Sequence, residues 1–198
     1  MKLVLATQNP KKLKEMNEIL SHLGVEVVNE AELGVRIEVE ETGETFTDNA
    51  RLKATAVMQA TGLPAVADDS GLCVDALNGG PGVYSARFGG EGLDDKGRYT
   101  LLLEMLRGQT DRAAHFHTSI VCAFPNGDEL VCEGECPGTI AFAPMGEGGF
   151  GYDPVFFVPE LRKTFGQLTA EEKASVSHRG KALRAFAAAL DDYLKGNE

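Results

Sequence analysis

Two adjacent aspartates, Asp68 and Asp69, follow the apolar segment 64–67 and precede Ser70 and Gly71. We expect the two carboxylates and the hydroxyl at the carboxyl end of a strand, where the glycine allows the backbone to turn. Neighbouring carboxylates in an apolar setting repel each other unless a hard cation such as Mg²⁺ neutralises their oxygens. The segment therefore predicts a divalent metal site. For an isolated segment of this kind, the alternative is an aspartate pair that is solvated at a turn.

A second candidate is the polar turn between the first expected strand and the first expected helix. It reads Thr7-Gln8-Asn9-Pro10-Lys11-Lys12. Backbone N–H groups at a helix N-terminus carry partial positive charge and suit a phosphate group, and Lys12 adds a full charge. A well-capped helix with lysines on its surface is the alternative.

The third candidate combines the acidic segment 38–43 with the helix that follows it. One glutamate of this segment would complete the coordination of a metal held by Asp69. Lys53 comes four residues after Asn49 on the same helical face, so both side chains would reach one ligand. The alternatives are a solvated run of charges and an exposed lysine.

Residues 146–154 form a glycine-rich loop that matches the pattern G-x-G-x-x-G. A dinucleotide site is excluded, because Pro154 and the apolar residues 155–157 predict a strand where the dinucleotide fingerprint requires a helix. Phe150 is flanked by glycines, and an exposed ring at this position would stack on a nucleic-acid base. A hydrophobic plug at a tight turn is the alternative.

The last candidate is Lys173 together with the segment Ser177-His178-Arg179-Gly180 between two expected helices. Histidine and arginine donate hydrogen bonds to carbonyl oxygens or phosphates, and Ser177 would cap the last helix. For His178 a purely structural role is the alternative. The pattern G-x-x-x-x-G-K-[ST] does not occur in the sequence, which argues against a phosphate cradle of the kinase or GTPase type.

The composition limits the class of protein. The chain has 198 residues, 43% of them hydrophobic, which suffices for one buried core and a single domain over residues 1–198. The net charge of −11 and the pI near 4.9 argue against a face that binds the phosphates of nucleic acid. No apolar run approaches the ~20 residues that cross a bilayer, and the start is too short for a signal peptide. We expect a cytoplasmic protein with no membrane partner.

The elements that must position these residues follow from hydrophobic periodicity, which predicts an α/β fold with a mixed sheet. Strands are expected at residues 2–6, 25–28, 64–67, 115–124, 129–133, 139–143 and 155–158. Helices are expected at residues 10–23, 48–61 and 95–106 and at the end of the chain, where Thr169 and Glu172 predict a capping box. The dipeptide Asn126-Gly127 predicts a hairpin.

The four cysteines lie in or beside apolar segments and lack the C-x-x-C spacing of a zinc or redox site. We expect buried, reduced thiols and assign no chemistry to Cys73, Cys122, Cys132 and Cys136.

Taken together, six segments resemble the inosine triphosphate pyrophosphatase family. They are Thr7-x-Asn9-x-x-Lys12, Glu40-Glu41-Thr42-Gly43, Phe46-x-x-Asn49-Ala50-x-x-Lys53-Ala54, Ala67-Asp68-Asp69-Ser70-Gly71, residues 148–154 and Ser177-His178-Arg179-Gly180. They occur in order over almost the whole chain, so the combination is highly specific. The family removes non-standard purine nucleoside triphosphates from the nucleotide pool.

The resemblance implies a two-lobed α/β domain, with a central mixed sheet flanked by helices, a nucleotide cleft between the lobes and, usually, a homodimer. The implied reaction is the Mg²⁺-dependent hydrolysis of ITP, dITP and XTP to the nucleoside monophosphate and pyrophosphate. Carried over by position, Glu40 and Asp69 bind the metal, and Asp69 is the general base with Asp68 as backup. Lys53 and residues 7–12 hold the triphosphate. The substrate and base contacts fall on Ser70, Phe150, Gly151, Tyr152, Asp153, Lys173, His178 and Arg179.

One position departs from the family pattern: Gln8 stands where the family usually has glycine. A side chain there crowds or supplements the approach of the backbone to a phosphate.

Three other functions stay open at the level of the sequence. A non-catalytic nucleotide-binding regulator would not need two aspartates in addition to the acidic segment 38–43. A nucleic-acid-binding protein would use the same lysines and Arg179, but the acidic total disfavours it. A pyrophosphatase for dUTP or a methylated pyrimidine triphosphate is the alternative among enzymes.

Overall fold

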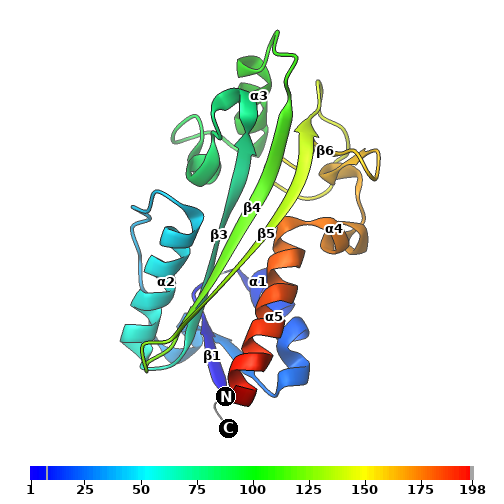
Figure 1. Ribbon diagram of the computed structural model, residues 1–198. Coiled ribbons are helices and arrows are strands. Elements are labelled where there is room, and N and C mark those ends of the chain that lie inside the picture. Colours follow the sequence, from blue (N-terminus) through cyan, green and yellow to red (C-terminus); the bar gives the residue numbers. More distant parts are fainter. Residues whose placement is uncertain (8, 197–198) are drawn as a thin grey trace. The chain divides into compact units, whose positions relative to one another are not determined.

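A seven-stranded mixed β-sheet flanked by helices forms the centre of the fold, in the strand order β2-β1-β3-β4-β5-β6-β7 (Figure 1). The computed structural model describes residues 1–7 and 9–196, without the side chains of Pro10 and Lys11. The strands are β1 Lys2–Leu5, β2 Glu26–Asn29, β3 Ala65–Val74, β4 Ala113–Ala123, β5 Glu129–Ile140, β6 Phe156–Val158 and β7 Lys163–Thr164. Strand β1 pairs in parallel with β2 and β3, whereas β6 pairs antiparallel with β5 and β7. The predicted α/β fold is confirmed.

The chain forms two compact units. The first unit contains the described residues up to Asp69, Thr118–Gly134 and the described residues from Lys181 onward. The second unit contains Ser70–His117 and Glu135–Gly180. Strands β3, β4 and β5 and the last helix contribute residues to both units.

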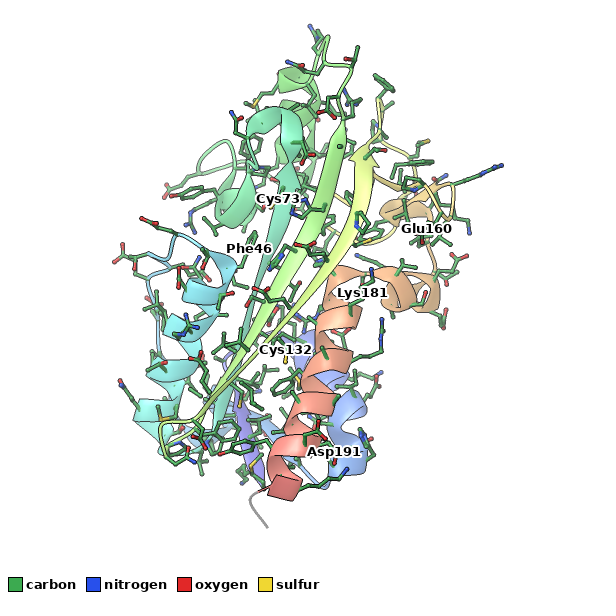
Figure 2. The ribbon with its side chains drawn as sticks, viewed as in Figure 1. Phe46, Cys73, Cys132, Glu160, Lys181 and Asp191 are labelled. Carbon is green, nitrogen blue, oxygen red and sulfur yellow. The ribbon has the colours of Figure 1, made fainter. Side chains whose placement is uncertain are left out.

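In the first unit, helices cover both faces of the strands. Helices α1 (Pro10–Leu20) and α5 (His178–Gly196) pack on the face that carries Leu5, Val66 and Ile120. Helix α2 (Phe46–Thr61) packs on the opposite face, through alanines that contact Ala67 and Val121. Figure 1 shows α2 and α5 on opposite sides of the strands, and Figure 2 shows Cys132 on the α5 side.

Helix α2 begins two residues earlier than expected because Thr45, rather than a later residue, is its N-cap. The Thr45 side chain accepts a hydrogen bond from the backbone N–H of Asp48. The helix ends at Gly62, whose φ of 69° lies in the left-handed region that glycine adopts readily. This end agrees with the sequence prediction.

The second unit has its own aromatic core. Phe116 and Phe165 each approach Phe156 edge-on, with ring centroids 4.7 and 4.8 Å apart. Around them lie α3 (Asp95–Met105) and α4 (Ala170–Val176). The predicted capping box is confirmed, since Thr169 and Glu172 exchange side-chain and backbone hydrogen bonds at the start of α4.

The predicted turn after the two aspartates is wrong, because β3 continues without a break from Ala65 to Val74. Leu72 and Val74 are fully buried, so the apolar pattern resumes beyond Gly71 and keeps the backbone extended. Likewise, the segments expected as two strands at 129–133 and 139–143 are joined in the single strand β5. The aspartates therefore lie in the middle of a strand.

All four cysteines are described, and all are thiols rather than disulfides. Cys122 is fully buried, and burial raises the pKa of its thiol, which keeps the thiol protonated. The prediction of free thiols is confirmed, whereas the prediction of burial holds for Cys122 and Cys136 but not for Cys73 and Cys132, which are half-buried. Within residues 1–7 and 9–196, no helix is long and apolar enough to cross a membrane.

Arg112 forms hydrogen bonds to the ends of α3 and β5 in the second unit. It is 8% exposed, and its guanidinium donates to the carbonyl oxygens of Leu106 at 3.1 Å, Ile140 at 2.6 Å and Ala141 at 2.9 Å. Desolvation by burial lowers the pKa of Arg112 below its ordinary value. Hydrogen bonds to three carbonyls offset that cost.

Replacing Arg112→Met leaves these carbonyls without their donors, so we expect the free energy of unfolding to fall by about 2–4 kcal/mol. Urea unfolding followed by circular dichroism measures the change. The exposed Arg107→Met removes the same charge and is expected to change stability by less than about 0.5 kcal/mol. Equal stabilities of the two variants would contradict this role of Arg112.

Candidate functional site

Asp68 and Asp69 point to opposite faces of the sheet. Successive side chains alternate along a strand, so Asp68 shares the face of Val66, and Asp69 shares the face of Ala67. The first face is covered by α1 and α5 and the second by α2. The two carboxylates consequently meet different cations.

Asp68 pairs with Lys12 in the first turn of α1. The side chain of Asp68 is 2% exposed, and its Oδ2 accepts a hydrogen bond from Lys12 Nζ at 2.8 Å. A carboxylate this deeply buried requires a charged partner. The pair therefore fixes the position of the lysine ammonium, whose side chain keeps 31% of its surface exposed.

Asp69 is held from α2. Its Oδ2 accepts from Asn49 Nδ2 at 3.1 Å, and its Oδ1 lies 3.6 Å from Lys53 Nζ. Asn49 and Lys53 share one face of α2, as the sequence predicted, and within this unit both contact Asp69. At 14% exposure, the side chain of Asp69 is more accessible than that of Asp68.

The acidic segment 38–43 is fastened to α2 at two points. Lys53 Nζ donates to Glu41 Oε1 at 2.7 Å, and the backbone N–H of Gly43 donates to Asn49 Oδ1 at 2.8 Å. Glu41 was not among the predicted site residues, because the sequence does not distinguish it from Glu40. The side chain of Glu40 is exposed.

The predicted phosphate turn is described in part. The backbone N–H of Asn9 donates to Thr7 Oγ1 at 3.2 Å, and the Asn9 carbonyl accepts the first bond of α1 from Leu13. The prediction for Gln8 falls outside the described residues, as do those for the side chains of Pro10 and Lys11. Lys12 is thus the cation of this turn whose position the structure gives.

In the second unit, the glycine-rich loop presents an exposed ring. Phe150 is 76% exposed, and Lys173 Nζ lies 4.8 Å from its ring centroid. The exposed ring agrees with the prediction and excludes the alternative of a hydrophobic plug. A flat, accessible ring beside an ammonium suits a planar heteroaromatic ligand.

The buried carboxylate of Asp153 stabilises this loop through hydrogen bonds. It is 3% exposed, and its Oδ2 accepts from the backbone N–H of Phe150 at 2.9 Å and from Lys173 Nζ at 2.5 Å. Burial raises the pKa of Asp153, and the two hydrogen bonds and the charge of Lys173 act in the opposite direction. A Cβ on Gly149, whose φ is 79°, would overlap the same carboxylate oxygen. Glycine is therefore required there.

Two hydrogen bonds, one buried and one exposed, fix the residues next to Phe150. The Tyr152 hydroxyl donates to the Ser85 carbonyl at 2.8 Å, and burial raises the pKa of Tyr152 to about 12, so the phenol stays neutral. The backbone N–H of Gly151 donates to Asp95 Oδ2 at 2.7 Å. Asp95 was not predicted as a site residue, because an aspartate in the first turn of a helix is usually explained by helix stability alone.

Most of the remaining predicted residues of this unit lie at or next to the start of α5. The His178 ring stacks on Phe116, with a centroid distance of 4.7 Å and an interplanar angle of 12°. Ser177 Oγ accepts from the backbone N–H of Gly180 at 3.0 Å, which confirms the predicted cap. Arg179 is half-buried, and Ser70 is exposed on β3.

Each unit therefore carries one part of the predicted site. In the first unit, Lys12 and Lys53 are held against Asp68 and Asp69, an arrangement that suits an anionic ligand. In the second unit, Phe150, Asp153 and Lys173 contact one another. Over residues 1–7 and 9–196, no three His, Cys, Asp or Glu side chains gather as metal ligands would.

Comparison with known proteins gives consistent results. The model of the Ham1 family matches residues 3–189. A dITP/XTP pyrophosphatase from Exiguobacterium is 50% identical over 196 residues, which cover 99% of this chain and 100% of that protein. One from Thermus thermophilus is 53% identical over 194 residues, covering 97% of this chain and 93% of the relative.

Solved structures agree with these relatives. The Ham1 protein of Staphylococcus aureus is 41% identical with a TM-score of 0.91, and the match covers 100% of both chains. A HAM1 protein from Coxiella burnetii is 43% identical with a TM-score of 0.93, covering 97% of this chain and 99% of the other.

Replacing Asp153→Asn removes the counter-ion of a partly buried ammonium, so we expect the free energy of unfolding to fall by about 2–4 kcal/mol. The matched control is Asp191→Asn (Figure 2), because Asp191 contacts Lys195 at the same 2.5 Å but on the surface. For the control we expect a loss below about 1 kcal/mol. Urea unfolding of both variants measures the difference, and equal losses would show that burial does not strengthen the Asp153 pair.

Proposed function

The chain belongs to the Ham1 family, and from this premise we propose that it hydrolyses dITP, ITP and XTP to the nucleoside monophosphate and pyrophosphate. The observation that carries the proposal is identity of 50% and 53%, over nearly the whole chain, to proteins named dITP/XTP pyrophosphatase. This product pair requires cleavage of the anhydride bond between the α- and β-phosphates, and we propose that water attacks the α-phosphorus. We infer the role of each residue from the contacts within each unit.

The first unit supplies the contacts to the triphosphate. Lys12 and Lys53 are already held by hydrogen bonds to Asp68 and Glu41, and each ammonium has further N–H donors that would bind phosphate oxygens. Thr7 and the backbone of the following turn complete the set predicted for the phosphates. Positioned cations of this kind neutralise the charge that develops during phosphoryl transfer.

Asp69 is the proposed general base. It is the more accessible of the two aspartates, and Asn49 fixes the direction of its carboxylate. A carboxylate in this setting accepts a proton from the attacking water and orients it. The deeper burial of Asp68 and its contact with Lys12 support a role in holding that lysine.

Mg²⁺ is part of the proposal, with Asp69 and Glu40 as protein ligands. Their oxygens suit a hard cation, and Lys53 already places a positive charge between Asp69 and Glu41. Mg²⁺ is usually bound by one or two carboxylates together with substrate phosphates, so the remaining ligands would come from the triphosphate and water. When bound, Mg²⁺ would neutralise charge on the triphosphate.

The second unit supplies the contacts to the base. Phe150 would stack on the purine, beside Lys173. Hypoxanthine and xanthine carry a carbonyl at position 6 that accepts from His178 or Arg179, whereas adenine carries an amino group there. Each donor left unmatched by adenine costs on the order of 1–3 kcal/mol, enough for useful selectivity.

The assembly and location predicted from the sequence also belong to the proposal. We propose a homodimer, on the resemblance to the family, and a cytoplasmic protein, because nucleoside triphosphates are made and used inside the cell.

The first experiment measures pyrophosphate release from ITP, dITP, XTP, ATP, GTP and dUTP side by side, with Mg²⁺ and then with EDTA. We expect turnover of ITP, dITP and XTP that requires Mg²⁺, and a loss of at least about 100-fold in kcat for Asp69→Asn. The fold of the variant is checked by circular dichroism, so that loss of activity is not confused with loss of structure.

Each other outcome identifies an alternative. Preference for dUTP would indicate a pyrimidine triphosphate pyrophosphatase. Folded protein that binds ITP but hydrolyses none of the six nucleotides would indicate a nucleotide-binding regulator. Retention on duplex DNA at moderate salt would indicate a nucleic-acid-binding protein.

A further inference from the structure

We propose that Asn49 is a positioning residue that holds the carboxylate of Asp69 and the acidic segment 38–43 in one fixed arrangement. The inference rests on the proposed function, because it assigns Asp69 the role of general base. Asn49 lies in the first turn of α2, which begins at Phe46 (Figure 2).

Both ends of the Asn49 amide are used. Nδ2 donates to Asp69 Oδ2 at 3.1 Å, and Oδ1 accepts from the backbone N–H of Gly43 at 2.8 Å. The side chain is fully buried, at 0% exposure. A buried amide with a donor and an acceptor on fixed partners cannot rotate without losing both bonds.

Gly43 shows how closely the acidic segment approaches Asn49. A Cβ at this position would lie 2.7 Å from Asn49 Oδ1 and 2.9 Å from its backbone nitrogen. Backbone atoms, and a side-chain amide that is held by two hydrogen bonds, cannot move aside easily. The glycine therefore permits the hydrogen bond that ties the segment to α2.

The side chains around Asp69 explain why a neutral donor is needed. Lys53 lies 3.6 Å from Asp69 and 2.7 Å from Glu41, and it is also a proposed contact of the triphosphate. When Lys53 turns to a phosphate, its hold on Asp69 weakens. Asn49 has no competing role, so its hydrogen bond keeps the direction of the carboxylate unchanged as substrate binds.

Asparagine suits this task better than its closest analogues. Aspartate at position 49 keeps an acceptor for the Gly43 N–H but places a second negative charge against Asp69. Serine is too short to reach both partners. The two substitutions thus disturb the Asp69 contact in different ways, one by charge and one by distance.

The test measures kcat and KM for ITP in Asn49→Asp and Asn49→Ser. We expect kcat to fall about 100-fold in each variant, the effect of displacing a reacting group by about 1 Å, with little change in KM. The matched control is Asn17→Asp, because Asn17 is a partly buried amide whose hydrogen bonds go to the backbone of Leu13 and Val27. The control is expected to lower the melting temperature without lowering kcat.

A double-mutant cycle separates positioning from folding. In an Asp69→Asn background, Asn49→Ser is expected to cause no further loss in the residual rate, because the group that it positions is already gone. A second loss of similar size would show that Asn49 acts through the fold, and would overturn the proposal.

Exchanging Asn49 and Asp69 tests their contact by a measurement that does not depend on enzymatic activity. In Asn49→Asp with Asp69→Asn, an amide again faces a carboxylate, so the melting temperature is expected to rise above that of Asn49→Asp alone. No rise in the melting temperature would contradict a direct hydrogen bond between the two residues.

The outcomes distinguish the positioning role from the proposed function. If wild-type protein fails to hydrolyse ITP, dITP or XTP, the proposed function fails. If wild type is active and both Asn49 variants keep full kcat, only the positioning role fails.

Discussion

The alternation of side chains along β3 is the constraint on which the charged part of the site depends. Because the strand does not turn after Asp68, the two aspartates face different helices, and each helix must supply its own cation or donor. Lys12 comes from α1, and Asn49 and Lys53 come from α2. A break in the strand at the two aspartates would remove this division, and with it the reason for two separate lysines.

Patterns among residues close in sequence were sufficient to predict most of the helices and strands and several contacts. The capping box at Thr169 and the glycine stop at Gly62 depend on residues close in sequence, so the chain itself predicts them. The exposed Phe150 also followed from its glycine neighbours. The resemblance to a family predicted a larger set of site residues than single motifs did.

Other features depend on partners that are distant in sequence. The continuous β3 required Leu72 and Val74 to be buried, which their sequence neighbours alone do not determine. The choice of Glu41 as the partner of Lys53, and of Asp95 as the acceptor for Gly151, is decided by packing between separate elements. Acidic residues are common at helix starts and in surface segments, so no local signal distinguishes these two.

The ion pairs of Lys12 and Lys53 have a further consequence, for the response to salt. A lysine that is exposed to solvent attracts counter-ions, and a phosphate that binds it releases them, which makes affinity fall steeply as salt rises. Here each ammonium already has a carboxylate in place. A triphosphate that binds these ammonium groups beside their carboxylates meets lysines that hold few counter-ions, so it releases few ions to the solvent. Such binding depends on ionic strength less than the number of lysines suggests, and the side chains lose little additional freedom because they are already ordered.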